Sequence, residues 1–220
     1  MTIRLLRALP ALLLLALAGH AAAQSPASGP SPALAETRTA IFAGGCFWCT
    51  ESDFDKVPGV VETVSGYTGG RTANPTYEQV GKGGTGHYEA VKVTYDPTRV
   101  TYPQLVEYYW RTVDPVDAGG QFCDRGESYR TAIFAATAEE RAAAEASARA
   151  LAASGKLPGP IVTPILDART FYPAEGYHQD YKKLNTLKYT FYRSRCGRDA
   201  RLEKLWGDAA GKWPVVAAGS

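Results

Sequence analysis

The segment Gly44–Glu51, with the sequence GGCFWCTE, holds the residues of this chain best suited to chemistry. The apolar run Thr39–Ala43 predicts a strand, and two glycines then permit a tight turn into a helix that ends before Val57. Cys46 is therefore expected in the first helical turn. There, unpaired N–H groups and the positive end of the helix dipole favour a thiolate and lower the pKa of the thiol. The pattern indicates a nucleophilic cysteine; the alternative is a buried structural cysteine in a tight turn.

A second group suited to chemistry is the carboxyl group of Glu89. The alternating segment His87–Tyr95 predicts a strand that places Glu89 on the same face as Val91 and Val93, the expected core face. A carboxyl group among apolar neighbours has a raised pKa, so it stays protonated near neutral pH and can act as a general acid. The alternative is that Glu89 lies close enough to the start of the strand to reach solvent.

Aromatic side chains accompany both groups in the sequence. Phe47 and Trp48 follow the thiol directly and suit a small apolar substrate group such as a methyl. Tyr77 precedes the Glu89 strand and Tyr129 follows a short loop, and their phenols can donate to an oxygen without adding charge. Each of the four has an alternative as a packing residue. Asp124, taken alone, is typical of a turn.

The chain contains four cysteines, Cys46, Cys49, Cys123 and Cys196, which allow three fully paired connectivities. Cys46 and Cys49 share one helical face, so a bond between them is sterically feasible. Cys196 lies in a basic, glycine-containing segment, where arginine charges favour its thiolate. A permanent disulfide that involves Cys123 or Cys196 is the alternative, since export favours disulfides. No second cysteine or histidine pair completes a zinc site, so we predict no metal.

The first 36 residues predict export. Basic residues precede the apolar stretch Ala8–Ala18, and small residues precede Gln24, so residues 1–23 are expected to be a signal peptide and the protein to be periplasmic or secreted. The alternative is an uncleaved membrane anchor. Residues 24–36 are rich in Pro, Ser and Ala and predict a disordered linker. Cleavage would leave 22 basic side chains against 22 acidic ones, which argues against a nucleic-acid partner.

The remaining chain predicts one α+β domain over residues 37–207, followed by a flexible tail over 208–220. The expected order is strand, helix, strand, strand, helix, strand, and then an Ala-rich helix that Thr137 begins and Gly155 ends. That order is typical of a two-layer sandwich with a ferredoxin-like split βαβ core and a mixed sheet. A short strand is expected at 161–166. From Asp167 onward we expect an irregular C-terminal segment wrapped on the domain.

A set of motifs from about Thr39 to Trp206 resembles, in order, those of the class A peptide methionine sulfoxide reductase family. A lone Cys-Phe-Trp is weak evidence, but the ordered set is highly specific. The motifs are GGCFW (44–48), SGYTGG (65–70), NPTY (74–77), GHYEAV (86–91), YDP (95–97), DRG (124–126), YR (129–130) and AEGYHQDY (174–181).

The resemblance implies a role for each candidate residue. Cys46 would attack the sulfoxide sulfur, and Glu89 would protonate the departing oxygen. Tyr77 and Tyr129 would hydrogen-bond that oxygen. The substrate-binding residues implied are Phe47 and Trp48, which would cup the substrate methyl, and Asp124, which would help to hold the substrate backbone.

The resemblance also implies the rest of the cycle. Methionine leaves, Cys46 becomes a sulfenic acid, and a second thiol condenses with it to a disulfide that an external thioredoxin-like dithiol reduces. Cys196 is favoured as the resolving thiol, and Cys49, where many family members have glycine, is its rival. The implied substrates are oxidised proteins and free methionine sulfoxide, in the S configuration at sulfur. We expect a monomer that needs no cofactor and does not associate stably with membranes.

Two other functions compete with this one. A thioredoxin-like thiol–disulfide oxidoreductase would use Cys46 and Cys49, with Thr163-Pro164 as a cis-proline, but it leaves Glu89 and the tyrosines without a task. A non-enzymatic metal-binding or peptide-binding module is the third reading. An insulin-reduction assay and a zinc determination, respectively, separate these readings from a sulfoxide reductase.

Overall fold

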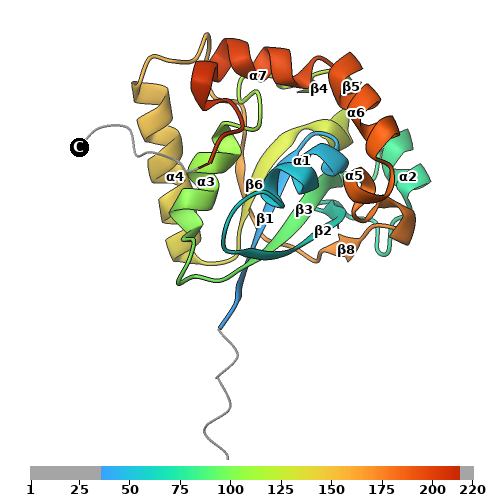
Figure 1. Cartoon of the computed structure of the whole chain (residues 1–220). Coiled ribbons are helices and arrows are strands. Elements are labelled where there is room, and N and C mark those ends of the chain that lie inside the picture. The colour runs from blue at the N-terminus through green and yellow to red at the C-terminus, as the bar shows by residue number, and fades with distance from the viewer. Residues whose placement is uncertain (1–35, 214–220) are drawn as a thin grey trace, which may run out of the picture. The chain divides into compact units, whose positions relative to one another are not determined.

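The computed structural model describes residues 36–213, so the expected signal peptide and nearly all of the expected linker lie outside the described residues. Figure 1 shows a sheet with helices packed against it. The strands are β1 (Arg38–Gly44), β2 (Val60–Thr68), β3 (Tyr88–Tyr95), β4 (Gly120–Gln121), β5 (Asp124–Arg125), β6 (Thr131–Ala135), β7 (Ile165–Asp167) and β8 (Tyr172–Pro173). The helices are α1 (Phe47–Phe54), α2 (Tyr77–Lys82), α3 (Tyr102–Trp110), α4 (Ala138–Ala153), α5 (Tyr181–Leu184), α6 (Thr186–Arg195) and α7 (Arg198–Trp206). Short 3₁₀ turns span Glu127–Tyr129, Gly176–His178 and Gly207–Ala209.

The sheet has the predicted split βαβ topology. Its order is β7-β6-β1-β3-β2-β8, and the units β1-α1-β2 and β3-α3-β6 interleave so that each pair of neighbours among the four central strands is antiparallel. Strand β7 pairs with β6 in parallel, which makes the sheet mixed, and β4 and β5 form a separate hairpin. The expected α+β sandwich with a ferredoxin-like core is therefore confirmed.

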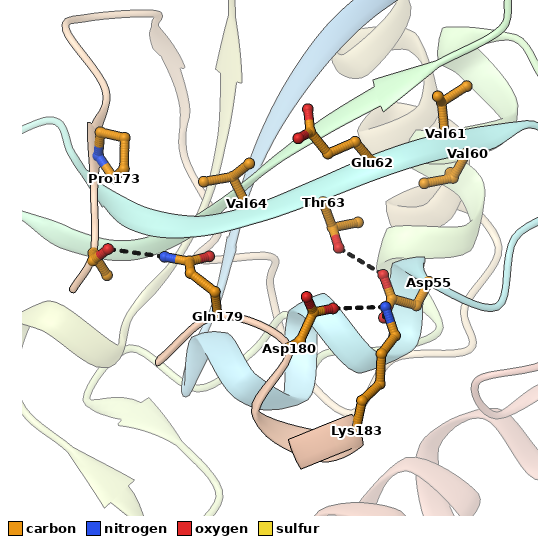
Figure 2. Close-up of a pocket in the computed structure, with 11 residues that line it drawn as sticks. Asp55, Val60, Val61, Glu62, Thr63, Val64, Pro173, Gln179, Asp180 and Lys183 are labelled. Atoms are coloured by element: carbon orange, nitrogen blue, oxygen red, sulfur yellow. Dashed lines mark hydrogen bonds and ion pairs between the residues drawn. The ribbon is translucent and has the colours of Figure 1, made fainter. Parts of the chain in front are cut away.

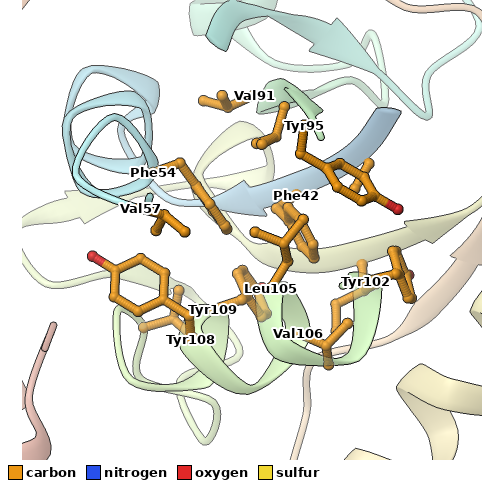
Figure 3. Close-up of a cluster of buried hydrophobic side chains, with 14 of the residues drawn as sticks. Phe42, Phe54, Val57, Val91, Tyr95, Tyr102, Leu105, Val106, Tyr108 and Tyr109 are labelled. Carbon is orange, nitrogen blue, oxygen red and sulfur yellow. The ribbon is translucent and has the colours of Figure 1, made fainter. Parts of the chain in front are cut away.

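Helices α1 and α3 cover one face of this sheet. Phe42 of β1 stacks on Phe54 of α1 at 4.9 Å between ring centroids and on Tyr109 of α3 at 5.2 Å (Figure 3). Leu105 of α3 and Val91 of β3 are fully buried in the same cluster. Because Val91 shares its strand face with Glu89, this packing turns the Glu89 carboxyl group toward the helical layer and away from solvent.

The opposite face of the sheet is covered by the chain that follows β7. Ala90 and Phe134 are buried there, and Ala168 and Phe171 of that segment pack against them. The expected strand at 161–166 is thus shorter and later, at 165–167. Its backbone pairs with β6 on the sheet edge, while the segment that continues from it covers the second face.

The C-terminal third differs from the predicted irregular segment, because it contains α5, α6 and α7. Most side chains of these helices are polar or charged. Their buried faces consist of few residues, chiefly Tyr189, Arg198 and Leu202, so no continuous apolar period marks them in the sequence.

Ordered contacts also extend past Gly207 into the expected flexible tail. The Gly211 N–H donates to the Arg111 carbonyl at 2.9 Å, and the Trp213 ring meets Tyr108 edge-on at 5.9 Å. Within residues 36–213, no helix is long and apolar enough to cross a bilayer.

Candidate active site

Cys46 lies at the junction of β1 and α1, as the sequence pattern predicts, but it is the N-cap of the helix and not part of its first turn. Its carbonyl accepts from the N–H groups of Cys49 at 3.1 Å and Thr50 at 3.2 Å. The chain reaches this position through Gly45, whose φ is +81° and where an added Cβ would lie 2.5 Å from the Gln121 Cβ. Only glycine fits this turn, which is why the diglycine precedes the cysteine.

The Cys46 thiol opens on a cavity of about 60 Å³. Seven of the candidate residues line it, although they come from five separate parts of the chain. The lining residues are Cys46, Phe47, Trp48, Tyr77, Glu89, Asp124, Tyr129 and, in addition, Tyr192. Cys49 and Cys196 do not line the cavity. The structure therefore gathers the proposed nucleophile, acid, phenols and aromatic wall around one small space.

Glu89 faces this cavity from β3 with only 2% of its surface exposed. Burial raises the pKa of Glu89 to about 8; the Phe47 N–H, which donates to Oε2 at 3.0 Å, offsets part of the rise, and the nearby Asp124 charge adds to it. The carboxyl group is thus protonated at neutral pH. The expectation that strand alternation buries Glu89 on the core face is confirmed, and solvent does not reach it.

The pKa of Cys46 moves in the direction opposite to the prediction. Burial raises the pKa of this thiol well above its usual range, and the hydrogen bond to Cys49 and the charges of Cys49 and Glu89 raise it further. Desolvation of a thiolate outweighs the favourable field of the helix N-terminus here, because the side chain is almost wholly enclosed. The free protein therefore holds Cys46 as a thiol.

Cys49 lies one helical turn later and is also a free, buried thiol. Its hydrogen bond with Cys46, together with the charges of Arg198 and Arg193, lowers the pKa of Cys49 to about 7. The two sulfurs share this hydrogen bond, so the first proton lost from the pair leaves a thiolate that the other thiol stabilises. The cavity decides which sulfur meets a substrate, because only Cys46 lines it.

An aromatic wall flanks the thiol. The Trp48 indole stacks on Tyr181 at 3.7 Å with an interplanar angle of 4°, and its Nε1–H donates to His178 Nδ1 at 3.0 Å. The His178 ring also lies 5.0 Å from Phe47 and 4.4 Å from Tyr77. Reasoning from single residues missed His178 and Tyr181. Only their place in the AEGYHQDY motif pointed to them.

The two phenols are held close to the cavity as proton donors. A hydrogen bond links Tyr129 to Tyr77, and burial raises the pKa of each, so both stay protonated. Glu175 fixes the start of α2, since its Oε1 accepts from the Tyr77 N–H at 2.8 Å while its Oε2 accepts from Tyr67 at 2.9 Å. Tyr129 lies in a 3₁₀ turn before β6, and this turn places it at the cavity.

The structure joins two of the four cysteines in a disulfide and leaves Cys46 and Cys49 as free thiols. Cys196 is bonded to Cys123, the structural alternative, so it has no free thiol in this form with which to attack a sulfenic acid. The disulfide fastens the tip of the β4–β5 hairpin to the junction of α6 and α7. Arg198 reinforces the same contact, with its guanidinium 4.7 Å from the Phe122 ring centroid. The hairpin so held carries Asp124 to the cavity.

Removal of this disulfide is expected to destabilise the fold. In Cys123→Ala with Cys196→Ala, the free energy of unfolding should fall by about 4 kcal/mol, because the bond closes a loop of 73 residues in the unfolded chain. Denaturant unfolding measures the change, and Cys49→Ala, which removes a buried thiol but no cross-link, is the matched control. An unfolding midpoint equal to that of the intact protein would contradict a stabilising role.

A larger groove, of about 490 Å³, lies away from the thiols against β2 (Figure 2). Three of its charged groups, Asp55, Asp180 and Lys183, already pair with one another. Lys183 contacts Asp180 at 2.6 Å and Asp55 at 3.1 Å, and Asp55 also accepts from Thr63 at 2.6 Å. Among residues 36–213, no cysteine or histidine lines the groove, so the smaller cavity at Cys46 is the candidate active site.

Comparisons with known proteins agree with this geometry. The family model of peptide methionine sulfoxide reductase matches residues 38–210. The chain is 57% identical over 176 residues to peptide methionine sulfoxide reductase MsrA 2 of Rhizobium meliloti, with 80% of this chain and 87% of the relative covered. It is 56% identical over 181 residues to MsrA 2 of Caulobacter vibrioides, with 82% and 91% covered.

Solved structures give the same result. Methionine sulfoxide reductase A of Corynebacterium diphtheriae is 40% identical with a TM-score of 0.62, over 69% of this chain and 76% of that one. Mxr1 of Saccharomyces cerevisiae in its reduced form is 29% identical with a TM-score of 0.65, over 69% and 87%. Pro164, the candidate cis-proline of a thioredoxin-like enzyme, does not line the cavity. Neither the cavity nor the two matched structures support a thioredoxin-like assignment. This chain belongs to the class A peptide methionine sulfoxide reductase family.

Proposed function

We propose that this protein reduces methionine S-sulfoxide, in oxidised proteins and as the free amino acid, to methionine. One observation carries the proposal: a buried carboxyl group that is protonated at neutral pH and a cysteine sulfur line the same small cavity beside an aromatic wall. A sulfoxide needs both a nucleophile at sulfur and a proton at oxygen. Phe47 and Trp48 offer an apolar surface to its methyl group.

The reaction balances within the cavity. Cys46 attacks the sulfoxide sulfur, Glu89 gives its proton to the oxygen, and the oxygen passes to Cys46, so that a thiol and a sulfoxide become a sulfenic acid and methionine. The proton of the Cys46 thiol replaces the one that Glu89 has given. Tyr77 and Tyr129 donate hydrogen bonds to the oxygen while it carries charge, and Asp124 holds the substrate backbone.

We further propose that Cys49 resolves the sulfenic acid. It is a free thiol hydrogen-bonded to Cys46, whereas Cys196 needs the bond to Cys123 to be broken first. Condensation of Cys49 with the Cys46 sulfenic acid releases water and forms a disulfide. A pKa near 7 suits Cys49 to this attack. An external thioredoxin-like dithiol then returns both cysteines to thiols, so electrons enter the cycle without a cofactor.

The place of action follows from the sequence of residues 1–23, which supports export to the periplasm or outside the cell. Methionine residues of exported proteins would then be the main substrates. We also propose that the protein acts as a monomer.

Activity on separate sulfoxide epimers tests the function. With a small dithiol as reductant, the purified protein is expected to convert the S epimer of N-acetylmethionine sulfoxide to N-acetylmethionine and to leave the R epimer unchanged, as chiral chromatography measures. The corresponding sulfone, which cannot be reduced this way, is the control. Equal consumption of both epimers, or of neither, would contradict the proposal.

A further inference from the structure

Tyr192 is a cavity residue to which neither the sequence motifs nor the proposed reaction assigns a role. It comes from the last turns of α6, in the polar C-terminal segment, and its phenol reaches the cavity beside Trp48, with the two rings edge-on at 5.8 Å. It packs in the same small cluster as Cys46 and Cys49.

The Tyr192 hydroxyl lies between two groups of the active site. It donates a hydrogen bond to Asp124 Oδ2, and it is also within hydrogen-bond reach of the Cys46 sulfur. Burial raises the pKa of Tyr192, so the phenol keeps its proton. A phenol has a single O–H and can donate fully to one acceptor at a time. Asp124 and Cys46 therefore compete for the same proton.

Asp124 wins this competition in the free protein. A carboxylate is the stronger acceptor, and Cys46 is then a thiol with no charge to stabilise. Asp124, however, lines the cavity and is only half-buried, so a substrate N–H can donate to it. A substrate N–H that donates to Asp124 withdraws charge from the carboxylate and weakens its hydrogen bond with Tyr192, so the Tyr192 hydroxyl can turn toward the sulfur.

The ring of Tyr192 is held in place while its hydroxyl turns. The next residue, Arg193, pairs with the buried Asp53 at 3.0 Å and donates to Tyr189 at 3.0 Å, which ties α6 to α1. One turn later, Cys196 is bonded to the hairpin that carries Asp124. A change of donor direction therefore needs rotation of one O–H bond and no movement of α6.

Two other ionisable groups act on Cys46 in the opposite direction to Tyr192. Glu89 and Cys49 are negative when they ionise, and both charges raise the pKa of Cys46. The hydrogen bond with Tyr192 lowers it. The Cys46 thiolate charge also raises the pKa of Tyr77, so this phenol stays neutral. The positive charge of Arg198 acts on Cys49 and Asp124.

We propose that Tyr192 is a further catalytic residue, whose hydroxyl moves from Asp124 to the Cys46 sulfur when a substrate amide occupies Asp124. The thiolate then forms at Cys46 with a peptide substrate bound and is disfavoured in its absence. The Cys46 proton leaves to solvent when the thiolate forms, Glu89 gives its own proton to the sulfoxide oxygen, and Glu89 takes a proton back from solvent at the end of the turnover. The inference rests on the proposed sulfoxide reduction.

The pH dependence of a single turnover tests this role. The rate of reduction is measured at saturating substrate with N-acetylmethionine sulfoxide N-methylamide, which carries amide N–H groups, and with dimethyl sulfoxide, which carries none. In the wild-type protein, we expect the acidic limb of the amide profile to lie at lower pH than that of dimethyl sulfoxide. In Tyr192→Phe, the two limbs should coincide, and the amide substrate should lose about tenfold in rate at neutral pH, in line with loss of a hydrogen bond to a charged group.

Tyr172→Phe is the matched control, since this half-buried tyrosine of β8 does not line the cavity, and it should keep the separation of the two limbs. Coincident limbs in the wild-type protein, or limbs that stay separated in Tyr192→Phe, would overturn the role of Tyr192 while sulfoxide reduction itself stands. Absence of turnover with either substrate in the wild-type protein would instead contradict the proposed function.

Discussion

Cys46→Ser is expected to form no methionine above background, with a fall in turnover of at least about 10⁴-fold. A serine hydroxyl in this buried site is neither acidic nor nucleophilic enough to attack sulfur. It also cannot accept the oxygen, as a thiol does when it becomes a sulfenic acid. Chromatography of N-acetylmethionine formed with excess dithiol measures the loss. Retained turnover in this variant would mean that another thiol starts the reaction.

Cys49→Ser is the matched variant and should fail at a different step. It is expected to form one equivalent of methionine and then to stop with a Cys46 sulfenic acid, which mass mapping with a sulfenic-acid reagent detects. Cys196→Ser should continue to turn over with a thioredoxin-like reductant. Full recycling in Cys49→Ser together with failure in Cys196→Ser would reinstate Cys196, the assignment that the sequence favoured.

Glu89→Gln is expected to lower the rate of the chemical step by about 10²–10⁴-fold, the usual contribution of a general acid. The amide keeps the shape of the side chain and an oxygen for the Phe47 N–H, so binding of substrate should change little. Rapid-quench measurement of a single turnover separates the chemical step from recycling. A rate within about twofold of the wild-type rate would exclude Glu89 as the acid.

The pH dependence of activity tests the same role of Glu89. The pKa of Glu89 is raised from its ordinary range to about 8, and its protonated form is the active one. The alkaline limb of the activity profile should therefore lie near pH 8, with activity falling as the pH rises through that value. This alkaline limb should vanish in Glu89→Gln. Glu51→Gln is the control. Burial also raises the pKa of Glu51, to about 7, but this residue lies outside the cavity, so the variant should keep the alkaline limb.

Local patterns in the sequence predicted much of the active site. Alternation along β3 was enough to place Glu89 on the core face, because side chains of a strand point to opposite sides with a period of two. The diglycine before Cys46 was enough to place the thiol at a helix start, since few other residues allow a positive φ there. Both inferences depend on the conformation of a few adjacent residues, and the structure agrees with both.

Inferences that depend on surroundings were less successful. The helix N-terminus predicts a lowered pKa for Cys46, yet burial raises it, because enclosure depends on segments far away in the sequence. The C-terminal helices α6 and α7 were missed for a related reason. They are held by single buried contacts such as Tyr189 and Arg198 with the rest of the domain, and not by an apolar face that a periodic pattern would reveal.

The sequence by itself determined the family, the split βαβ core and the identity of the nucleophile, acid and aromatic wall as candidates, because each is written in short segments with local conformational rules. Only the tertiary structure decided that Cys123 pairs with Cys196 and that Tyr192 shares the cavity. These are contacts between segments up to about 150 residues apart. Such pairings depend on how the whole chain packs, and no spacing within a single element encodes them.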